Sequence, residues 1–472
     1  MSKSITLLLV LFFLTASCIV IAKPAFSSVA VAEDSWISKA PMHEARSGVG
    51  VAVVNGKIYA IGGSTQSGQW PNIRGGTVGT NEEYDPATDT WTFKVPLPTP
   101  RHVFATAVCQ NKIYCIGGYT SNGTVTGVNE VYDPATDTWE NKAPMPTARI
   151  GLQANAANGK IYLIGGYVPA YYTTQNFSSS FLTLNEVYDP ATDSWAKKAP
   201  MPTAASNYAS AVVDNKIYLI GGLFKSEEFN LNQIYDPKTD TWRQGTPSPS
   251  ITAYGAAGAT TGVNAPKRIY ILGQDFSFPE PPYINRVYDP ENNSWTFGVA
   301  VPTNRRGLVV AVVNDMLYAI GGYTETYSDL FSNSCVTPYA TNEQYTPIGY
   351  GTIPPVISVL SPENNSTYAS SNVSLSFTVN KPAVWLGYSL DGQETVTVTS
   401  NTTIDGLTNG LHNITVYAKD EFENMGTTET IYFTIAKEPE PEPFPATLVA
   451  TVAFSIVAIA TGLLVYFRKR KH

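Results

Sequence analysis

Cysteine and histidine are scarce in this chain. Its 472 residues include four of each, so a metal site or a catalytic thiol would have few side chains to draw on. Charged residues make up only 14% of the chain, and the formal net charge is −8. Nucleic-acid surfaces need clustered Lys and Arg to neutralise phosphates, so we expect no nucleic-acid partner. Pro, Gly, Tyr, Thr and Asn are plentiful instead, which favours strands and turns over helices.

The two ends of the chain are hydrophobic and predict different functions. Residues 1–32 begin with a short basic region and an apolar stretch, followed by small residues that suit cleavage. We interpret them as a signal peptide, with an uncleaved membrane anchor as the alternative. Residues 446–467 carry no charge and exceed the ~20 residues that a transmembrane helix needs, and a basic stub follows at 468–472. Because basic flanks stay in the cytoplasm, we expect a single-pass type I protein of the cell membrane with most of the chain extracellular.

N-x-S/T sequons agree with an exported chain and predict a glycoprotein. Five of the eight sequons fall between residues 364 and 413, where we expect a second region with a surface of its own. Residues 437–445 are rich in Pro and Glu and have the composition of a semi-rigid stalk. The candidate glycosylation sites are Asn122, Asn176, Asn292, Asn364, Asn365, Asn372, Asn401 and Asn413.

One ten-residue phrase recurs through the first two thirds of the chain. It reads EEYDPATDTW at 82–91, EVYDPATDTW at 130–139 and EVYDPATDSW at 186–195, and looser copies follow. The repeated Trp residues, at 36, 91, 139, 195, 242 and 295, are spaced by 47–56 residues. Repeats of about 50 residues with Gly and aromatic signatures indicate propeller blades. Within each repeat, four short stretches of alternating polarity predict four strands.

The Gly pair, the later Tyr and the Trp seven residues after that Tyr resemble the kelch repeat. Six copies cover residues 33–348, so the resemblance implies an all-β fold with a six-bladed kelch-type β-propeller. The fifth copy has Gly273–Gln274 in place of the Gly pair, and the sixth has no Trp after Tyr345. Because the chain starts with a Trp stretch of its own, we predict that residues 35–39 pair antiparallel beside Tyr345 and complete the sixth blade.

The paired aspartates of the repeat, such as Asp85 and Asp89, have two interpretations. Asp85 and Pro86 suit the first two positions of a type I turn. Calcium needs six to eight oxygen ligands, and two carboxylates fall short of that number. We therefore favour the turn and expect no bound metal and no other cofactor.

One face of the predicted propeller carries the long loops, at 64–81, 167–184 and 323–342, which makes it the expected ligand face. Its aromatic candidates are Trp70, Tyr171, Tyr172 and Tyr327. Four arginines share one aligned position on this face, where the fourth and fifth repeats have Ala205 and Thr252: Arg46, Arg101, Arg149 and Arg305. In the kelch substrate adaptors that this chain resembles, arginines at the matching position contact acidic peptides. The alternative is that these arginines pair with carboxylates of their own blades.

Cys109 and Cys115 flank the short hairpin CQNKIYC. A cross-strand disulfide suits an exported protein, and two plain buried thiols are the alternative.

The sequence pattern changes after the last repeat. Residues 349–436 contain about seven short strand patterns and resemble an Ig-like or fibronectin-III-like β-sandwich, with Trp385 expected in its core. This module would lift the propeller from the membrane.

No catalytic triad, no phosphate-binding loop and no assignable acid–base pair stands out in the sequence. We therefore expect a non-enzymatic cell-surface binding or adhesion protein whose ligand is an extracellular protein, peptide or glycan. Some kelch-like propellers are sugar mutarotases or copper oxidases. That resemblance leaves a carbohydrate-active enzyme, mutarotase/epimerase-like or lyase-like, as the alternative.

Overall fold

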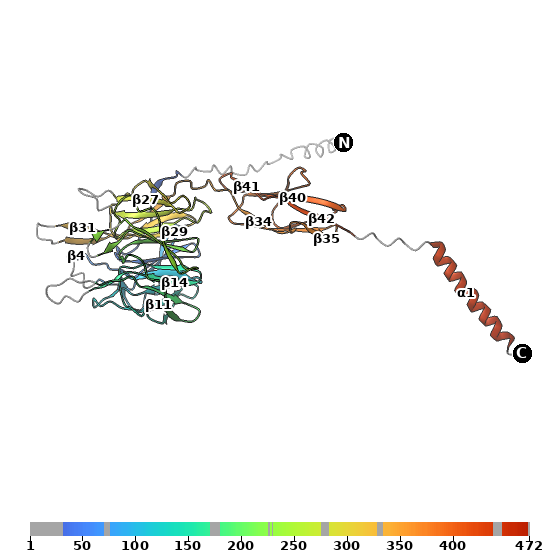
Figure 1. The fold of residues 1–472 in the computed structure, drawn as a ribbon, viewed down its shortest axis with the longest axis horizontal. Helices are drawn as coiled ribbons and strands as arrows, with labels where there is room; N and C mark the ends of the chain where they lie inside the picture. The colour runs from blue at the N-terminus through green and yellow to red at the C-terminus, as the bar shows by residue number, and fades with distance from the viewer. Residues whose placement is uncertain are drawn as a thin grey trace, which may run out of the picture. The chain divides into compact units, whose positions relative to one another are not determined.

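The computed structural model describes residues 32–69, 76–169, 180–224, 227–228, 230–274, 283–327, 334–437 and 446–470. The chain divides into two compact units on either side of the Ile353–Pro354 bond (Figure 1). Each unit is described by itself below. The expected signal peptide (except for its last residue) and most of the expected stalk lie outside the described residues.

Four-stranded antiparallel sheets make up the first unit. Its described residues contain six such sheets, and each consists of strands that follow one another along the chain, except that β1 completes the last. In sheet order they are β2, β3, β5 and β6 (Gly50–Val54, Lys57–Ile61, Asn81–Asp85, Thr90–Lys94); β8, β9, β11 and β12 (Ala105–Cys109, Lys112–Ile116, Asn129–Asp133, Thr138–Lys142); β13, β14, β17 and β18 (Ala154–Ala157, Lys160–Ile164, Asn185–Asp189, Ser194–Lys197); β19, β20, β23 and β24 (Ala209–Val213, Lys216–Ile220, Asn232–Asp236, Thr241–Gln244); β25, β26, β27 and β28 (Ala256–Ala259, Ile269–Gln274, Tyr283–Asp289, Ser294–Gly298); and β29, β30, β33 and β1 (Val309–Val313, Met316–Ile320, Asn342–Thr346, Ser35–Lys39).

The first strand of each sheet contacts the first strands of its two neighbours. β2 contacts β8, and the order continues through β13, β19, β25 and β29 back to β2, so the six strands close a circle. The hydrophobic core lies between the sheets, because each main cluster draws its residues from two successive sheets. Neither face of an isolated sheet could be covered by that sheet alone, so every repeat has to supply the same packing residues.

The repeated Tyr and Trp lie opposite each other on the third and fourth strands of each sheet. Tyr84 pairs in register with Trp91, and their ring centroids are 4.9 Å apart. Tyr84 also meets Tyr318 of the neighbouring sheet edge-on, at 5.8 Å. These large rings fill the space between sheets and repeat from one pair of sheets to the next.

The first and last strands of the unit pair with each other in the sixth sheet. β1 runs antiparallel to β33, with Trp36 opposite Tyr345. Their ring centroids are 4.9 Å apart, the same separation as for Tyr84 and Trp91. The Trp36 Nε1–H donates to the Val299 carbonyl of the preceding sheet at 2.9 Å. The sixth sheet is therefore completed by the N-terminal strand.

The fifth repeat departs from the others through an insertion after its first strand. Residues 261–265 of this insertion wrap around the buried carboxylate of Asp315, which accepts the backbone N–H groups of Thr261, Val263, Asn264 and Ala265. One carboxylate of the sixth sheet thus fixes the extra loop of the fifth.

Short strands lie in the loops of the first unit. They are β4 (Gly68–Gln69), β7 (Arg101–His102), β10 (Tyr119–Thr120), β15 (Tyr167–Val168), β16 (Ser180–Phe181), β21 (Leu223–Phe224), β22 (Glu227–Glu228), β31 (Tyr323–Tyr327) and β32 (Ser334–Pro338). β31 and β32 form a hairpin in the last repeat, and β4 of the first repeat pairs with its second strand. This small sheet joins the loops of the first and last repeats.

The second unit also consists of strands. One sheet has the order β34, β36 and β39 (Ile357–Ser361, Val373–Val379, Thr402–Ile404), and the other has the order β35, β42, β40, β37 and β38 (Ser366–Tyr368, Ile431–Ile435, Gly410–Lys419, Trp385–Leu390, Val396–Val398), with β41 (Met425–Thr427) beside β40. A single hydrophobic cluster contains Leu375 and Ile404 of the first sheet and Val416 and Phe433 of the second.

Trp385 is not part of that core, contrary to the sequence-based expectation. Leu386, Tyr388 and Leu390 of β37 face the cluster. Side chains alternate between the two sides of a strand, so Trp385 has the opposite orientation, and its ring lies close to Gly387.

One helix follows, α1 (Ala446–Lys469), and Arg468 and Lys469 occupy its last turn. Residues Thr451–Lys469 are long and apolar enough to cross a membrane.

Candidate functional site: the central cavity

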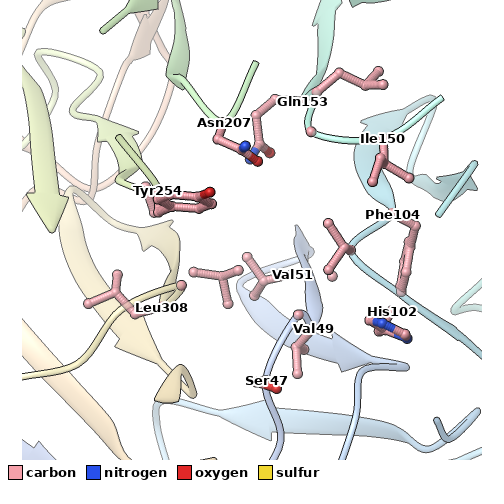
Figure 2. A pocket seen from close by; sticks show the side chains of 18 of the residues that line it. Ser47, Val49, Val51, His102, Phe104, Ile150, Gln153, Asn207, Tyr254 and Leu308 are labelled. Atoms are coloured by element: carbon pink, nitrogen blue, oxygen red, sulfur yellow. The ribbon is translucent and has the colours of Figure 1, made fainter. Parts of the chain in front are cut away.

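A cavity of about 490 Å³ opens where the first strands of the six sheets begin. Its walls come from the segments that lead into those strands, so all six sheets contribute (Figure 2). Tyr119, Tyr167 and Tyr323, from the loops between second and third strands, also line it. The cavity therefore lies on the face that carries the long loops, as expected for a ligand site on a rigid scaffold.

The wall of the cavity has an apolar part and an amide-bearing part. Val49, Val51 and Leu308 lie together on one side of it, and Phe104 and Ile150 lie on another. Gln153 and Asn207 direct their side-chain amides toward the same part of the cavity. The Tyr254 ring lies on the neighbouring wall (Figure 2). Such a mixture binds a ligand through apolar contact and orients it by a few hydrogen bonds.

One residue per repeat at the cavity mouth has a left-handed backbone. These six residues stand two positions after the aligned arginine position, with φ between 51° and 67°: Gly48, Val103, Gly151, Asn207, Tyr254 and Gly307. Neighbouring repeats are joined there, because the N–H groups of Val103 and Asn207 donate to the carbonyls of Gly48 and Gly151 at 2.9 and 2.8 Å. Tyr254 N–H donates in turn to the Asn207 carbonyl at 2.9 Å.

The four aligned arginines are in the interior and do not form a cationic ring on the ligand face. Arg46, Arg101, Arg149 and Arg305 are each 0% exposed. Each guanidinium pairs with a glutamate on the third strand of its own sheet: Glu82, Glu130, Glu186 and Glu343 respectively. The expectation that they contact an acidic ligand is therefore wrong for this structure, and the alternative of internal ion pairs describes them.

Each arginine also donates hydrogen bonds to backbone carbonyls. Arg149 donates from Nε to the Gly165 carbonyl at 2.8 Å and from Nη2 to the Leu163 carbonyl at 2.9 Å, and Arg305 repeats both contacts with Gly321 and Ala319. A buried charge is tolerated only when it is paired and hydrogen-bonded in this way. These arginines tie the segment that leads into each first strand to the second and third strands.

The two repeats without the arginine also lack the glutamate. In the fourth repeat Ala205 replaces the arginine and Gln233 the glutamate, and Gln233 exchanges two hydrogen bonds with the backbone of Thr203. In the fifth repeat Thr252 and Arg286 stand at these positions, and Arg286 Nε donates to Ser250 Oγ at 2.7 Å. Arginine and glutamate thus occur together or not at all, a signal that was present in the sequence.

Little net charge remains on the described wall of the cavity. Arg306 and Glu325 line it, and they pair with each other at 2.8 Å. His102 stacks on Tyr119 with ring centroids 5.6 Å apart. Burial lowers the pKa of His102 to about 4, so this imidazole is neutral at physiological pH.

The structure describes little of the aromatic candidates in the long loops. Trp70, Tyr171 and Tyr172 lie outside the described residues. Tyr327 ends β31, which pairs with β32, but its side chain is outside the description. Tyr119, Tyr167, Tyr254 and Tyr323 line the cavity. Tyr167 and Tyr323 belong to the long loops that the sequence points to, whereas Tyr119 and Tyr254 were missed because only the folded chain brings them to the cavity.

Cys109 and Cys115 are free and buried, so the disulfide that we considered is wrong. Cys109 lies opposite Lys112 in the β8–β9 hairpin, and Cys115 lies opposite Thr106. Their side chains enter different core clusters, one on each side of the sheet. A cross-strand disulfide needs both thiols on the same face of the hairpin, and the strand register places them on opposite faces.

The aspartates of the repeated turns are engaged in hydrogen bonds. Asp85 Oδ1 accepts the Ala87 N–H at 2.9 Å, as in an Asx turn. Asp89 Oδ1 accepts the Tyr84 hydroxyl at 2.6 Å and the Ala40 N–H of the neighbouring sheet at 2.9 Å. The turn interpretation therefore accounts for both side chains. Among the described residues, no cluster of three or more His, Cys, Asp or Glu has the geometry to hold a metal ion.

Most of the candidate glycosylation sites that the structure describes are at the surface. Asn413, on β40, is half-buried, and Asn176 lies outside the described residues. The exposed sites are Asn122, Asn292, Asn364, Asn365, Asn372 and Asn401.

Comparison with known proteins identifies the repeats of the first unit. The Kelch motif matches residues 45–98, and the KLHDC2/KLHL20/DRC7 Kelch-repeats domain matches residues 105–322. Kelch-like protein 15 of Danio rerio is 32% identical over 203 residues, which are 40% of this chain and 32% of that protein. Kelch-like protein 35 of Homo sapiens is 42% identical over 188 residues, 40% of this chain and 28% of that protein. The chain thus spans about a third or less of the length of these relatives.

The solved structure of YjhT has the same fold. It superposes with a TM-score of 0.50 at 18% identity and covers 63% of this chain and 95% of its own. Together with the closed circle of four-stranded sheets, these matches show that the first unit is a kelch-repeat β-propeller.

Proposed function

We propose that this chain is a non-enzymatic binding protein of the cell surface. In this proposal a six-bladed kelch propeller presents its central cavity to an extracellular partner, an Ig-like sandwich at 349–436 acts as a spacer, and α1 anchors the protein in the membrane. The observation that carries the binding role is the cavity of about 490 Å³, walled by all six sheets on the face with the long loops. The Kelch-like relatives support a role as a platform for protein interaction.

The membrane part of the proposal rests on α1 and its flanks. The side chains described on α1 are exposed, including Phe454, Ile456 and Leu464. An exposed apolar surface of this length suits lipid better than water. Arg468, Lys469 and Arg470 follow the apolar part and would keep this end in the cytoplasm. The signal peptide at 1–32 and glycans on the exposed sequons belong to the same proposal.

Selection from a library of short disulfide-cyclised peptides, with the full-length chain in detergent, tests the cavity. Gln153 is exposed at the cavity, so Gln153→Trp fills this space without disturbing the core. Gln244→Trp is the matched control, because Gln244 is exposed on the outer strand β24. We expect Gln153→Trp to weaken the selected peptides by at least about tenfold and Gln244→Trp to leave them unchanged. Equal binding by both variants would place the site elsewhere.

Topology has a separate test. Peptide-N-glycosidase treatment of the chain made in a glycosylating secretory pathway should increase its mobility on a gel. Protease added outside intact cells should remove the bulk of the chain and leave a fragment that contains residues 446–472. A chain that stays unglycosylated and protected would contradict the surface location.

A further inference from the structure

The six left-handed residues at the cavity mouth, one per repeat, do not all have side chains. Three repeats have glycine there and three have a side chain: Val103, Asn207 and Tyr254. A Cβ on Gly48 would come within 3.0 Å of Val103 Cγ2 of the following repeat. A Cβ on Gly151 would meet Tyr167 at 2.8 Å and Asn207 Oδ1 at 3.2 Å, and a Cβ on Gly307 would meet Tyr323 at 2.8 Å. Side chains at all six positions would therefore require these neighbours to move.

The backbone at this position does not require a side chain. Glycine adopts the left-handed conformation freely, whereas a β-branched residue such as Val103, at φ 53°, is a rare outlier. Tyr254 has the same strain at φ 54° and leaves 42% of its surface exposed beside the cavity. Val103 is 40% exposed. Strained, exposed side chains beside a cavity mark candidate binding positions.

The charges on the described part of this wall balance each other. The buried arginines are matched by glutamates, Arg306 is matched by Glu325, and His102 is uncharged. Gln153 and Asn207 offer carboxamides, which carry both a donor and an acceptor and so match the peptide group. Val51, which is half-buried, offers aliphatic surface at the cavity, and the nearly buried Val49 and Leu308 lie beside it (Figure 2). Among the described wall residues, Arg306 and Glu325 are already paired with each other, so a charged ligand would lose its hydration and have to compete with that pair for a partner.

From this arrangement we propose that the cavity selects an uncharged turn of a partner polypeptide, and that Val103, Asn207 and Tyr254 determine this selectivity. The turn would place one aliphatic side chain against Val51 and would hydrogen-bond its backbone to Asn207 and Gln153. This inference rests on the proposed binding function and specifies its ligand class. It departs from the acidic ligand that the sequence resemblance implies.

The experiment compares two triple glycine variants of the full-length chain. Val103→Gly/Asn207→Gly/Tyr254→Gly removes the three side chains at the mouth. Asn55→Gly/Asn158→Gly/Asn314→Gly is the matched control, because these three exposed residues also have positive φ but stand in turns at the other end of the first strands. Asn207→Gly alone gives a milder test, since it removes a single carboxamide. All variants are screened against the cyclic peptide library, divided into neutral, acidic and basic sequences, and against a glycan array.

We expect wild type and the control to enrich neutral peptides with an aliphatic residue at the turn. The mouth variant should lose at least about tenfold in affinity for them, with a melting temperature close to that of wild type. Asn207→Gly should show an intermediate loss. Enrichment of acidic peptides whose binding Gln153→Trp abolishes would overturn the neutral ligand class and leave the proposed function intact. Glycans that bind wild type but not the mouth variant would overturn the polypeptide ligand. Peptides that bind both triple variants equally would contradict the role of these three residues. Failure of wild type to enrich any peptide and to bind any glycan would contradict the proposed function itself.

Discussion

The carboxylate of Asp34 accepts a hydrogen bond from the hydroxyl of Tyr345 at 2.6 Å, across 311 positions of sequence. The same oxygen accepts the Val299 N–H of the preceding sheet at 2.7 Å. Asp89 makes the same two kinds of contact in the first sheet: it accepts the Tyr84 hydroxyl of its own sheet and the Ala40 N–H of the neighbouring sheet. The sixth repeat lacks its own turn aspartate and Trp in the sequence. In the structure, Asp34 and Trp36 from the N-terminal segment take these two places.

Asp34→Ala should destabilise the whole propeller. The substitution leaves the buried Tyr345 hydroxyl and the Val299 N–H without their acceptor, which costs about 1–3 kcal/mol for a buried group. Asp34→Asn is the control, because the fifth sheet has Asn293 in this position with the same Tyr288 contact, at 2.6 Å. Urea unfolding of the full-length chain, followed by Trp fluorescence, measures both. Equal midpoints for Asp34→Ala and wild type would show that this link contributes nothing to closure.

Arg101→Ala should cost stability whether or not a ligand is present. It leaves Glu130 charged and buried without its partner, a defect worth about 3–5 kcal/mol in other proteins. Arg101→Ala/Glu130→Gln should recover part of the loss, because it copies the Ala205 and Gln233 combination of the fourth repeat. Chemical denaturation of the single and double variants provides the comparison. Unchanged stability in Arg101→Ala would favour a ligand-binding role over the internal ion pair.

His102 should make the propeller less stable in mild acid. Its pKa is lowered by burial to about 4 in the folded chain, compared with about 6.5 in an unfolded chain. The unfolded state therefore binds more protons between these values, so stability falls as pH decreases through that window. His102→Gln removes this contribution and should flatten the pH dependence of the melting temperature between about pH 7 and pH 5. A His102→Gln profile that parallels the wild-type profile would show that folding leaves the pKa of His102 unchanged.

Cys109 and Cys115 should remain unreactive in the native protein. Burial raises the pKa of Cys115 to about 12 and also raises that of Cys109, so the nucleophilic thiolate is scarce in both. A maleimide added to the native chain should leave the tryptic peptides that contain these residues unlabelled, and labelling should follow denaturation in the absence of any reductant. Labelling that appears only after reduction would demonstrate a disulfide.

The sequence predicted the part of the fold that the repeat encodes. Tyr and Trp recur because every pair of sheets has the same gap to fill, and Trp36 could be assigned to the last sheet because that repeat lacked one. The matching role of Asp34 was also readable, since an Asp or Asn precedes each repeated Trp by two positions.

The errors concern the direction of side chains. Cys109, Cys115 and Trp385 were placed on the wrong face, because a shift of one residue within a strand reverses orientation. Pairing of the aligned arginines with carboxylates of their own blades was the alternative, but the particular glutamates, which stand 29–38 positions later, were not identified from the sequence. The cavity wall combines residues from all six repeats, so it became visible only in the folded chain.

Hydrogen–deuterium exchange of the full-length chain with and without a selected neutral peptide tests the central claim most directly. We predict slower exchange in the segments that lead into the first strands, such as 102–106, 150–155 and 253–257, because these segments line the cavity. The turns at 55–56, 110–111 and 158–159, between first and second strands, should exchange at unchanged rates. Protection confined to those turns, or to the second unit beyond Pro354, would contradict binding at the central cavity.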